Sequence, residues 1–551
     1  MNRFVRIIPL GGLREVGINS TVFETENDMV LMDAGLMFPE EDMLGVDIVI
    51  PDFSYVYENK EKFRALVLTH AHEDHVGAIP YLLQNVRVPI YGTKLTLGLV
   101  KEKLKEFKIE NVKMVEIRAS EKFRIGDFEF EPIRTTHSIV DGVGFAITTS
   151  VGTIIHTGDF KIDQTPVDGK PFDILKFAEY GSKGVRLLMS DSTNANVPGY
   201  TGSERNIKRA FSEIFANAKG RILLVTFASN IHRIQQVINT AVETGKKVCI
   251  TGKSMLQNAT IARQLGYLEV PEGVLITEGE INNYPEHKVV VVTTGSQGEP
   301  MSGLSRIALG EHKRIKIKPT DTVVISAKAI PGNERAVLKI INSLMKKGAD
   351  VYFSGNSDVH VSGHASQEEL KLMINMVRPE FFMPIHGEYM MRRQHAKIAE
   401  SLGISPDKIF NVDNGDVLEL RADGMRKVGT VRTGRVFVDG KGVGDIEDLV
   451  LRDRMRLSTD GFVVIIALVN ATTGELLSDP EIITKGLLDE DKSQKLLYEA
   501  TMMIKNLINQ SDINLKTDAF EIKKKIRKAM NKFLYKKLMR NPMVLPIIME
   551  V

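Results

Sequence analysis

The stretch Thr69-His70-Ala71-His72-Glu73-Asp74-His75 follows a short apolar run at 64–68 and precedes a second apolar stretch at 77–83. The first run is typical of a buried strand and the second of a helix. Neutral imidazole and carboxylate are the ligands that zinc and manganese favour in proteins. Histidines two residues apart in an extended segment also project to the same side. We therefore predict a metal site in this loop, rather than a histidine-rich loop without a function.

Three further candidate ligands come directly after other predicted strands. His137 follows an apolar run at 130–136, Asp159 follows 153–156, and His386 follows 381–385. Open α/β sheets generally build their sites beyond the carboxyl ends of strands. Each residue alone is as typical of an ordinary structural polar side chain as of a ligand. Together with the histidine-rich loop, they predict one composite metal site.

Short apolar runs alternate with helical stretches through most of the chain. The predicted strands are Ala65–Thr69, Thr153–His156, Leu187–Ser190, Ile222–Thr226, Val289–Thr293, Thr322–Ser326 and Phe381–Ile385. A predicted amphipathic helix, Glu388–Leu402, follows the last of these strands. This alternation predicts an α/β architecture of layered sheets and helices.

The length and composition indicate a soluble globular protein with several cores. The chain has 551 residues, of which 43% are hydrophobic and 26% are charged. Its net charge of +2 is too small to indicate a nucleic-acid partner by itself. The single cysteine, Cys249, excludes an internal disulfide and a cysteine-based zinc site. With no signal-like start and no apolar run near the roughly 18 to 20 residues of a membrane helix, we expect a cytoplasmic protein without membrane contact.

The last part of the chain differs in composition from the rest. A glycine-rich segment at 434–445 predicts a connector, and a strand-like run at 461–469 follows it. A basic helix is predicted at 521–539, with Ile526, Phe533 and Leu534 facing inward. Its lysines would either attract a phosphate backbone or simply form a solvated face.

The histidine-rich loop and its downstream partners resemble the two-metal site of the metallo-β-lactamase superfamily. The resemblance implies that His70, His72 and His137 hold one ion, that Asp74, His75 and His386 hold the other, and that Asp159 bridges the two. It also implies that Asp33 orients ligands without binding metal, although a plain turn carboxylate is the alternative. The cofactor would be two divalent ions, zinc in the first place, with manganese or magnesium as alternatives. Such ions ionise a water near neutral pH and can grip both oxygens of a phosphodiester.

An insertion of roughly 150 residues, between Ser203 and Gly355, separates His386 from the other ligands. This insertion resembles the β-CASP domain of nucleases in the same superfamily, whose motifs are matched by Asp191, His364 and His386. The resemblance implies that His364 is a general acid for the leaving oxygen and that Asp191 holds its ring. A structural alternative for His364 is a cap on a helix that starts near Gln367. Histidine in the third motif is associated with RNA-directed members.

Further strings resemble the bacterial and archaeal ribonuclease J family over nearly the whole chain. They are GGLREVG at 11–17, FPE at 38–40, TFASNIHR at 226–233 and TGSQGEP at 294–300. Arg14 departs from the family pattern, where a small residue is expected, and would change only the rim of the groove.

The implied fold is an α/β metallo-β-lactamase αββα sandwich with an inserted β-CASP α/β domain and a small C-terminal α/β domain. The sandwich would occupy residues 1–204 and 356–430, and the insertion 205–355. A linker at 431–450 and a C-terminal domain at 451–551 would follow.

The implied activity is hydrolysis of single-stranded RNA, both internally and from the 5′ end, in rRNA processing and mRNA decay. A homodimer or homotetramer, and a place in an RNA-decay complex or on the ribosome, are implied as well. Exonuclease activity needs a pocket for a 5′-phosphate, and the first candidate is Ser362, Gly363, His364 and Ala365 at a helix start. The second is Ser229, Asn230, His232 and Arg233, with Phe227 available to stack on a base. Both segments could instead be tight strand–helix turns.

Three other functions fit parts of the pattern. A DNA-directed β-CASP nuclease would share every ligand, and only His386 in the third motif argues against it. An RNA-binding scaffold in a decay complex or on ribosomes, with secondary catalysis, is the second alternative. A hydrolase of small molecules is the third, but it would leave the insertion without a purpose.

Overall fold

The computed structural model describes residues 3–40, 42–299, 301–330, 332–440, 442–446, 448–488, 494–510 and 519–551. Pro300 of the TGSQGEP string, and Lys441 and Glu447 of the predicted connector, lie outside these ranges. The chain forms two compact units, Met1–Phe38 with Val49–Val436 and Pro39–Ile48 with Phe437–Val551. Among the described residues, no helix combines the length and apolarity needed to cross a membrane.

Two sheets pack face to face in the first unit. The first has the order β21-β20-β1-β2-β3-β5-β6-β7, and the second has the order β19-β12-β11-β10-β9-β8. Val30, Phe145 and Met189 are among the buried side chains that fill the space between them. The strands of the first sheet are β1 (Phe4–Gly11), β2 (Ser20–Glu24), β3 (Met29–Met32), β5 (Phe63–Val67), β6 (Ile90–Gly92), β7 (Met114–Glu116), β20 (Asp416–Arg421) and β21 (Gly424–Thr430). Those of the second are β8 (Phe123–Ile125), β9 (Phe128–Arg134), β10 (Val143–Thr149), β11 (Gly152–His156), β12 (Val185–Asp191) and β19 (Pro379–Ile385).

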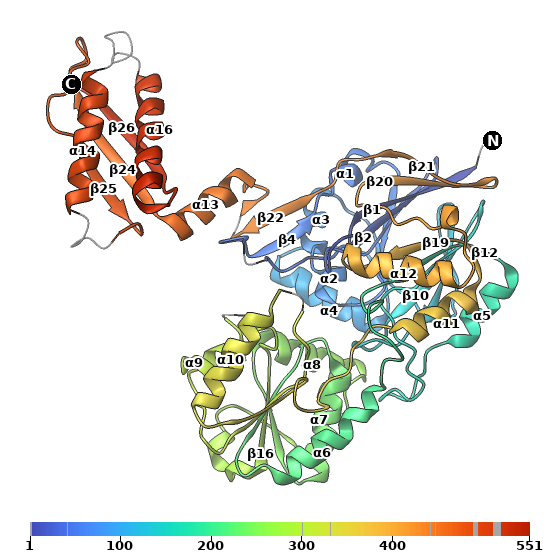
Figure 1. The fold of residues 1–551 in the computed structure, drawn as a ribbon. Helices are drawn as coiled ribbons and strands as arrows, with labels where there is room; N and C mark the ends of the chain where they lie inside the picture. The colour runs from blue at the N-terminus through green and yellow to red at the C-terminus, as the bar shows by residue number, and fades with distance from the viewer. Residues whose placement is uncertain are drawn as a thin grey trace. The chain divides into compact units, whose positions relative to one another are not determined.

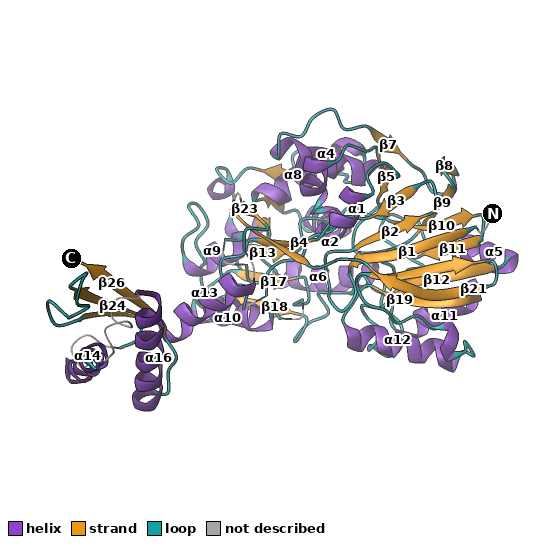
Figure 2. Ribbon diagram, turned by 90° about the horizontal axis from the view of Figure 1, so that it is seen from above, coloured by secondary structure: helices purple, strands orange, loops and turns teal. Residues whose placement is uncertain are grey.

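Helices cover the outer face of each sheet. Helices α3 (Ile79–Asn85) and α4 (Lys94–Glu106) lie on the first sheet, where α4 contacts β6 and β7. The second sheet is covered by α5 (Ile174–Lys183), α11 (Gln367–Val377) and α12 (Tyr389–Ser401), as Figure 2 shows. Phe177, Leu370 and Ile398 of these helices pack on Ile155 of β11. The predicted αββα sandwich is therefore confirmed. Shorter elements of this part are β4 (Ile48–Pro51), α1 (Ser54–Glu58), α2 (Glu73–Val76) and the 3₁₀ helix η4 (Pro406–Lys408).

The insertion forms its own parallel sheet between β12 and α11 (Figure 1). The strand order is β15-β14-β16-β13-β17-β18, and every pairing is parallel. Alternate residues of β13 face opposite cores: Ile222 packs with α6, α7 and α8, whereas Leu223 packs with α9 and α10. Burial on both faces accounts for its continuous apolar runs. The strands are β13 (Ile222–Val225), β14 (Lys247–Ile250), β15 (Leu275–Ile276), β16 (Val289–Thr293), β17 (Thr322–Ile325) and β18 (Asp350–Phe353). The helices are α6 (Ile207–Asn217), α7 (Ile231–Glu243), α8 (Lys253–Leu265), α9 (Gly303–Leu309) and α10 (Glu334–Lys346), with 3₁₀ helices η1 (Glu204–Asn206), η2 (Ile281–Asn283) and η3 (Glu286–Lys288).

The second unit contains a small α/β sheet, as predicted. Strand β24 (Phe462–Val469) lies between β25 (Glu481–Lys485) and β26 (Met543–Glu550). Helices α14 (Gln494–Asn509) and α16 (Ala519–Leu538) pack on one face of the sheet. Ile526 and Leu534 of α16 are buried there and Phe533 is partly buried, so their predicted inward orientation is confirmed.

The segment predicted as a connector, 431–450, is more regular than expected. It contains β22 (Arg435–Asp439) and β23 (Gly442–Val443), and α13 (Asp448–Asp460) begins inside it. Phe437 and Val438 are buried, and this apolar pair supports a strand where the surrounding glycines suggested only a turn.

We predict that Phe145→Ala destabilises the sandwich by about 3–5 kcal/mol, because it opens a cavity between the two sheets. The Phe145 side chain is fully buried and packs edge-to-face on Phe130. Because the chain contains no tryptophan, urea unfolding would be followed by far-UV circular dichroism to measure the loss of stability. Leu175→Ala, at a side chain that is 83% exposed, is the matched control and should change the midpoint little. Equal midpoints for the two variants would contradict the packing described here.

Candidate metal centre

The histidine-rich segment changes backbone conformation at His72. His72 is extended, with φ −70° and ψ 151°, and occupies the N-cap position of the short helix α2 without a side-chain capping hydrogen bond. Glu73 and Asp74 fill the first turn of α2, where carboxylates favour the positive end of a helix. The segment described from the sequence as a histidine-rich loop, 69–75, is therefore helical from Glu73 onward. The change of direction separates His70 and His72 from Asp74 and His75, so one short segment reaches two places.

One group of potential ligands consists of His70, His72, His137 and Asp159. Nε2 of His70 lies 3.1 Å from Nδ1 of His72, which in turn lies 3.0 Å from Nε2 of His137. Oδ2 of Asp159 is 3.7 Å from His70 Nε2 and 3.8 Å from His137 Nε2. One ligand atom from each residue fits within 4.8 Å of all the others, which is compact enough to surround one ion.

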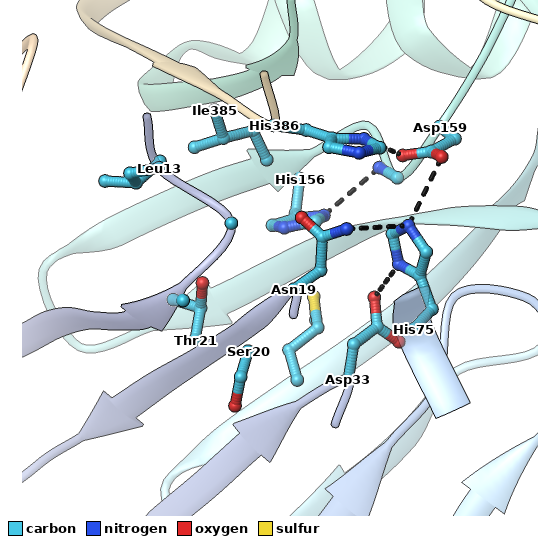
Figure 3. Close-up of a pocket in the computed structure, with 14 residues that line it drawn as sticks. Leu13, Asn19, Ser20, Thr21, Asp33, His75, His156, Asp159, Ile385 and His386 are labelled. Atoms are coloured by element: carbon cyan, nitrogen blue, oxygen red, sulfur yellow. Dashed lines mark hydrogen bonds and ion pairs between the residues drawn. The ribbon is translucent and has the colours of Figure 1, made fainter. Parts of the chain in front are cut away.

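A second group consists of Asp74, His75, His386 and the same Asp159. Figure 3 shows His75, Asp159 and His386 of this group. Oδ2 of Asp159 is 3.2 Å from Nε2 of His75, and its Oδ1 is 2.8 Å from Nδ1 of His386. Oδ2 of Asp74 lies 3.6 Å from His75 Nε2 and 3.4 Å from His386 Nε2. Asp159 thus belongs to both groups, and its two oxygens face different histidines.

The protonation preferences of His70 and His137 fit metal ligation, whereas the surrounding carboxylates raise the pKa of His75 and His386. Burial and the neighbouring histidines hold the pKa of His70 and His137 well below the ordinary value, so both rings are neutral. Burial opposes the charged form of His386, but Asp159 and Asp74 outweigh it and raise its pKa. Nε2 of His386 is buried and makes no hydrogen bond with any described residue. A divalent cation would satisfy this nitrogen and balance the carboxylates, so the donor set fits two such ions.

Other groups hold the ligand rings from behind. Oδ2 of Asp33 accepts a hydrogen bond from Nδ1 of His75 at 2.7 Å, and its Oδ1 accepts one from the backbone N–H of Thr69 at 2.9 Å. Nδ1 of His137 donates to the carbonyl of Gly363 at 2.7 Å. Each bond leaves the other ring nitrogen, Nε2, for the metal site. Asp33 therefore lies where the resemblance places it, behind a ligand.

Asp33 and His386 are both held in the left-handed backbone region, with φ of 59° and 49°. That conformation costs a non-glycine residue about 1 kcal/mol or more. Both residues immediately follow a strand, β3 or β19, and the unusual turn directs each side chain back over the sheet edge. The backbone strain therefore lies at the ends of the two strands that these site residues follow.

Asp191 and His364 form a pair beside the two groups. Oδ2 of Asp191 lies 2.7 Å from Nδ1 of His364. Oδ1 of Asp191 accepts hydrogen bonds from the N–H and hydroxyl of Thr193, so the carboxylate is held at both oxygens. Burial opposes the charged form of His364, but Asp191 outweighs it and raises the pKa of His364 above its ordinary value. The ring centre of His364 is 4.8 Å from that of His137, which places this imidazole at the edge of the site.

Asn19 contacts the site but was not predicted. Its Nδ2 donates to the carbonyl of Asp74 at 3.2 Å and lies 3.3 Å from Oδ2 of the same residue. The only signal in the sequence was its place two residues after the GGLREVG string. Asn19 also lines a cavity of about 20 Å³ behind His75 and His386, which has room for one water molecule (Figure 3).

The backbone amides of the first predicted phosphate pocket are largely engaged. The N–H of Ala365 donates to the carbonyl of Phe160 at 2.7 Å, and the N–H of His364 donates to Oγ of Ser362 at 3.2 Å. The expectation that these two amides are free is therefore wrong. Ser362 itself is partly exposed, and the carbonyl of Gly363 faces His137.

The second predicted RNA-binding segment divides into an accessible half and a buried half. Phe227 and Ser229 are partly exposed, whereas His232 is buried and Asn230 caps α7 by accepting a hydrogen bond from the N–H of Arg233. Arg233 has no exposed surface, and its guanidinium is bound to Glu204. The prediction that Arg233 contacts RNA is wrong, because folding has already satisfied its charge inside the protein.

A sandwich with a ligand-bearing edge, interrupted by a parallel α/β insertion, defines a metallo-hydrolase of the metallo-β-lactamase fold. The matching family models are described as the metallo-β-lactamase superfamily (13–186), the ribonuclease J β-CASP domain (219–344), a Zn-dependent metallo-hydrolase RNA specificity domain (354–409) and the ribonuclease J C-terminal domain (449–551).

Relatives that match nearly the whole chain identify the family within this class of metallo-hydrolases. The chain is 43% identical to ribonuclease J2 of Bacillus subtilis, over 99% of both chains. It is 44% identical to ribonuclease J of Thermus thermophilus, over 99% of this chain and 95% of the relative. It is 42% identical to ribonuclease J of Helicobacter pylori, over 98% of this chain and 79% of the relative. The chain therefore belongs to the ribonuclease J family.

A solved structure shares the fold. It is the crystal structure of a protein of unknown function from Enterococcus faecalis V583, with a TM-score of 0.55 and 16% identity. It covers 76% of this chain and all of its own. At that identity the likeness supports the fold alone.

We predict that Asp33→Ala weakens metal binding by roughly 10- to 100-fold, because His75 loses the acceptor that orients its ring. The metal content after dialysis against graded chelator concentrations, measured by elemental analysis, checks this. Asp52→Ala is the control, since Asp52 is also a buried carboxylate but accepts its hydrogen bonds from Ser54. Identical metal retention in the two variants would show that Asp33 does not support the site.

Proposed function

We propose that this protein is a metal-dependent ribonuclease that hydrolyses phosphodiester bonds of single-stranded RNA, both internally and from the 5′ end. The observation that carries the proposal is the sharing of Asp159 by two compact ligand groups, with the Asp191–His364 pair beside them. Hydrolysis adds water to phosphorus and breaks the bond to one ester oxygen, which must leave with a proton. The site holds groups suited to both requirements.

We assign His70, His72, His137 and Asp159 to one ion, and Asp74, His75, His386 and Asp159 to the other. Zinc suits this set of imidazoles and carboxylates, and manganese or magnesium remain alternatives. When bound, two such ions supply Lewis acidity and make water ionise near neutral pH. The protein's own contribution is to hold the ligand rings in fixed orientations, through Asp33 and the Gly363 carbonyl.

His364 is proposed as the general acid. Its Nδ1–H points at Asp191, so Nε2 is the nitrogen that faces substrate. The raised pKa keeps the ring protonated near neutral pH, ready to donate the Nε2 proton to the leaving oxygen. Asp191 stabilises the imidazolium and prevents the ring from turning away. A helix cap is not the role of this ring, because Ser366 caps α11 with its own side chain.

Recognition of the RNA 5′ end is proposed at Ser229 and Ser362, two partly exposed hydroxyls, with Phe227 stacking on a base. The 5′-phosphate would be bound by these hydroxyls rather than by the engaged amides of residues 364 and 365. This arrangement favours 5′-to-3′ exonuclease activity, and endonuclease activity requires only that a chain passes through the same site.

The family resemblance supports several broader proposals. We propose domain limits at 204/205, 355/356, 430/431 and 450/451, a homodimer or homotetramer, and a cytoplasmic role in RNA maturation and decay. A decay complex or the ribosome is the proposed setting.

We predict that Asp74→Ala abolishes hydrolysis of RNA while the fold is kept, because the second ligand group loses a carboxylate. Product formation from a labelled single-stranded RNA, with single-stranded DNA of the same sequence alongside, measures this. Glu73→Ala is the matched control: Glu73 is the adjacent acid of α2 and pairs with Lys103 instead. Full activity in a folded Asp74→Ala protein would overturn the metal-dependent mechanism, and faster cleavage of the DNA would overturn the choice of substrate.

We predict that an RNA carrying a 5′-monophosphate releases labelled mononucleotide before longer fragments, whereas the 5′-triphosphate form does not. The RNA is labelled at its first nucleotide, and products are followed over time with added manganese or magnesium. Ser362→Ala should reduce this difference between the two RNAs. Longer labelled fragments from both forms at equal rates would make the enzyme chiefly an endonuclease.

A further inference from the structure

The chain enters and leaves the insertion through two crossings. The outbound crossing contains η1, which begins at Glu204, and the return crossing runs from Val359 to Gly363. The return crossing lies against the metal site, because it ends at the carbonyl that accepts the hydrogen bond of His137. His364 follows directly, so the position of the return crossing sets the position of the proposed general acid.

Arg233 binds both crossings at once. Nη2 and Nε of its guanidinium lie 2.9 and 3.3 Å from Oε2 of Glu204. Nη1 donates to the carbonyl of Ser326 at 2.7 Å and to that of Val359 at 3.3 Å. Ser326 follows β17, so one side chain joins the outbound crossing, the end of a central strand of the insertion, and the return crossing.

Glu204 continues this contact into the metal domain. Its backbone N–H donates to Oδ2 of Asp163 at 3.1 Å. Nζ of Lys161 lies 3.8 Å from both carboxylates and donates to the carbonyl of Gly202 at 3.1 Å. The side chains of Lys161 and Glu204 are nearly without exposed surface, as that of Arg233 is. We call Lys161, Asp163, Glu204 and Arg233 the crossing cluster; it contains two cations and two anions.

The crossing cluster touches the loops that carry metal ligands. Lys161 is two residues beyond Asp159, and its backbone N–H donates to the carbonyl of Thr136 at 2.8 Å. The hydroxyl of Thr136 donates back to the carbonyl of Lys161 at 2.6 Å. Thr136 directly precedes His137. The loops of two ligands are therefore tied to each other and, through the cluster, to both crossings.

Stability alone gives little reason for such an arrangement. Four charges removed from water lose solvation that their mutual attraction roughly offsets, and apolar side chains of the same size are often as stable. What apolar packing would not supply is a defined geometry, since guanidinium hydrogen bonds have fixed directions.

We infer that the crossing cluster positions the return crossing, and with it His364, over the metal ligands, and that Arg233 and Glu204 are positioning residues for the reaction. The inference rests on the proposed function, because it assigns to the cluster an effect on proton donation to the leaving oxygen. Arg233 acts through His364 and touches no substrate.

The test compares two substrates in the full-length, metal-loaded protein. One is a single-stranded RNA, whose leaving oxygen needs a proton. The other is the p-nitrophenyl ester of thymidine 5′-monophosphate, whose leaving group departs as a stable anion. Arg233→Met should lower kcat on RNA on the order of 10- to 100-fold. It should leave the p-nitrophenyl activity within about two-fold of the unchanged protein, because that leaving group needs no proton. Arg233→Lys, which keeps the charge but not the fork of donors, should recover part of the loss.

Arg221→Met is the matched control. Arg221 forms an equally buried pair with Asp321, with 2.7 Å between Nη2 and Oδ2. The pair lies at the N-terminal ends of β13 and β17, whereas Ser326 lies at the C-terminal end of β17. It should destabilise the insertion without changing the ratio of the two activities. Equal losses on both substrates in Arg233→Met, or no loss on either, would overturn the inference.

His364→Ala separates a failure of the inference from a failure of the proposed function. It should reproduce the selective loss on RNA, roughly 100- to 10,000-fold. If His364→Ala shows no selectivity, proton donation by His364 is wrong and the cluster has nothing to position. If His364→Ala is selective and Arg233→Met is not, only the inference fails.

Discussion

The contacts between the carboxylate of Asp159 and the histidines around it are the interaction on which the arrangement of the first unit depends. It is almost completely buried, and a buried carboxylate is tolerated only where cations or donors surround it. The histidines that face it come from the turn after β5, the turn after β9 and the end of β19. These segments meet only because both sheets present strand ends at one edge. The sandwich can be understood as the frame that brings these three strand ends within reach of one carboxylate.

The class of fold and the main members of the site were predictable from the sequence. The signal was local: three histidines and two acids in six residues, and polar residues directly after apolar runs. β16 has the predicted bounds, and α12 differs from its prediction by one residue at each end. The split of the ligands between two groups came from a family resemblance, and the backbone turn at His72 supplies its physical reason.

Long-range pairing was what the sequence did not reveal. Arg233 stands beside loop residues that are open to solvent, and nothing local distinguishes it from them. Its partner Glu204 is 29 residues away, and the carbonyl of Val359 is 126 residues away. The same holds for Asn19, whose contact with Asp74 spans 55 residues. In the sequence alone, a basic residue near a strand–helix turn is equally compatible with binding RNA and with pairing to a buried carboxylate. Only the fold shows which partner is within reach.

The separation of His386 from the other ligands has a consequence during synthesis. His386 lies 227 residues beyond Asp159, with the whole insertion between them. At ordinary elongation rates that interval takes roughly 10 to 45 s. During that interval a nascent chain with six of the seven ligands already made lacks one member of its second ligand group. The order of the sequence thus postpones completion of the ligand set until 386 of the 551 residues have been synthesised.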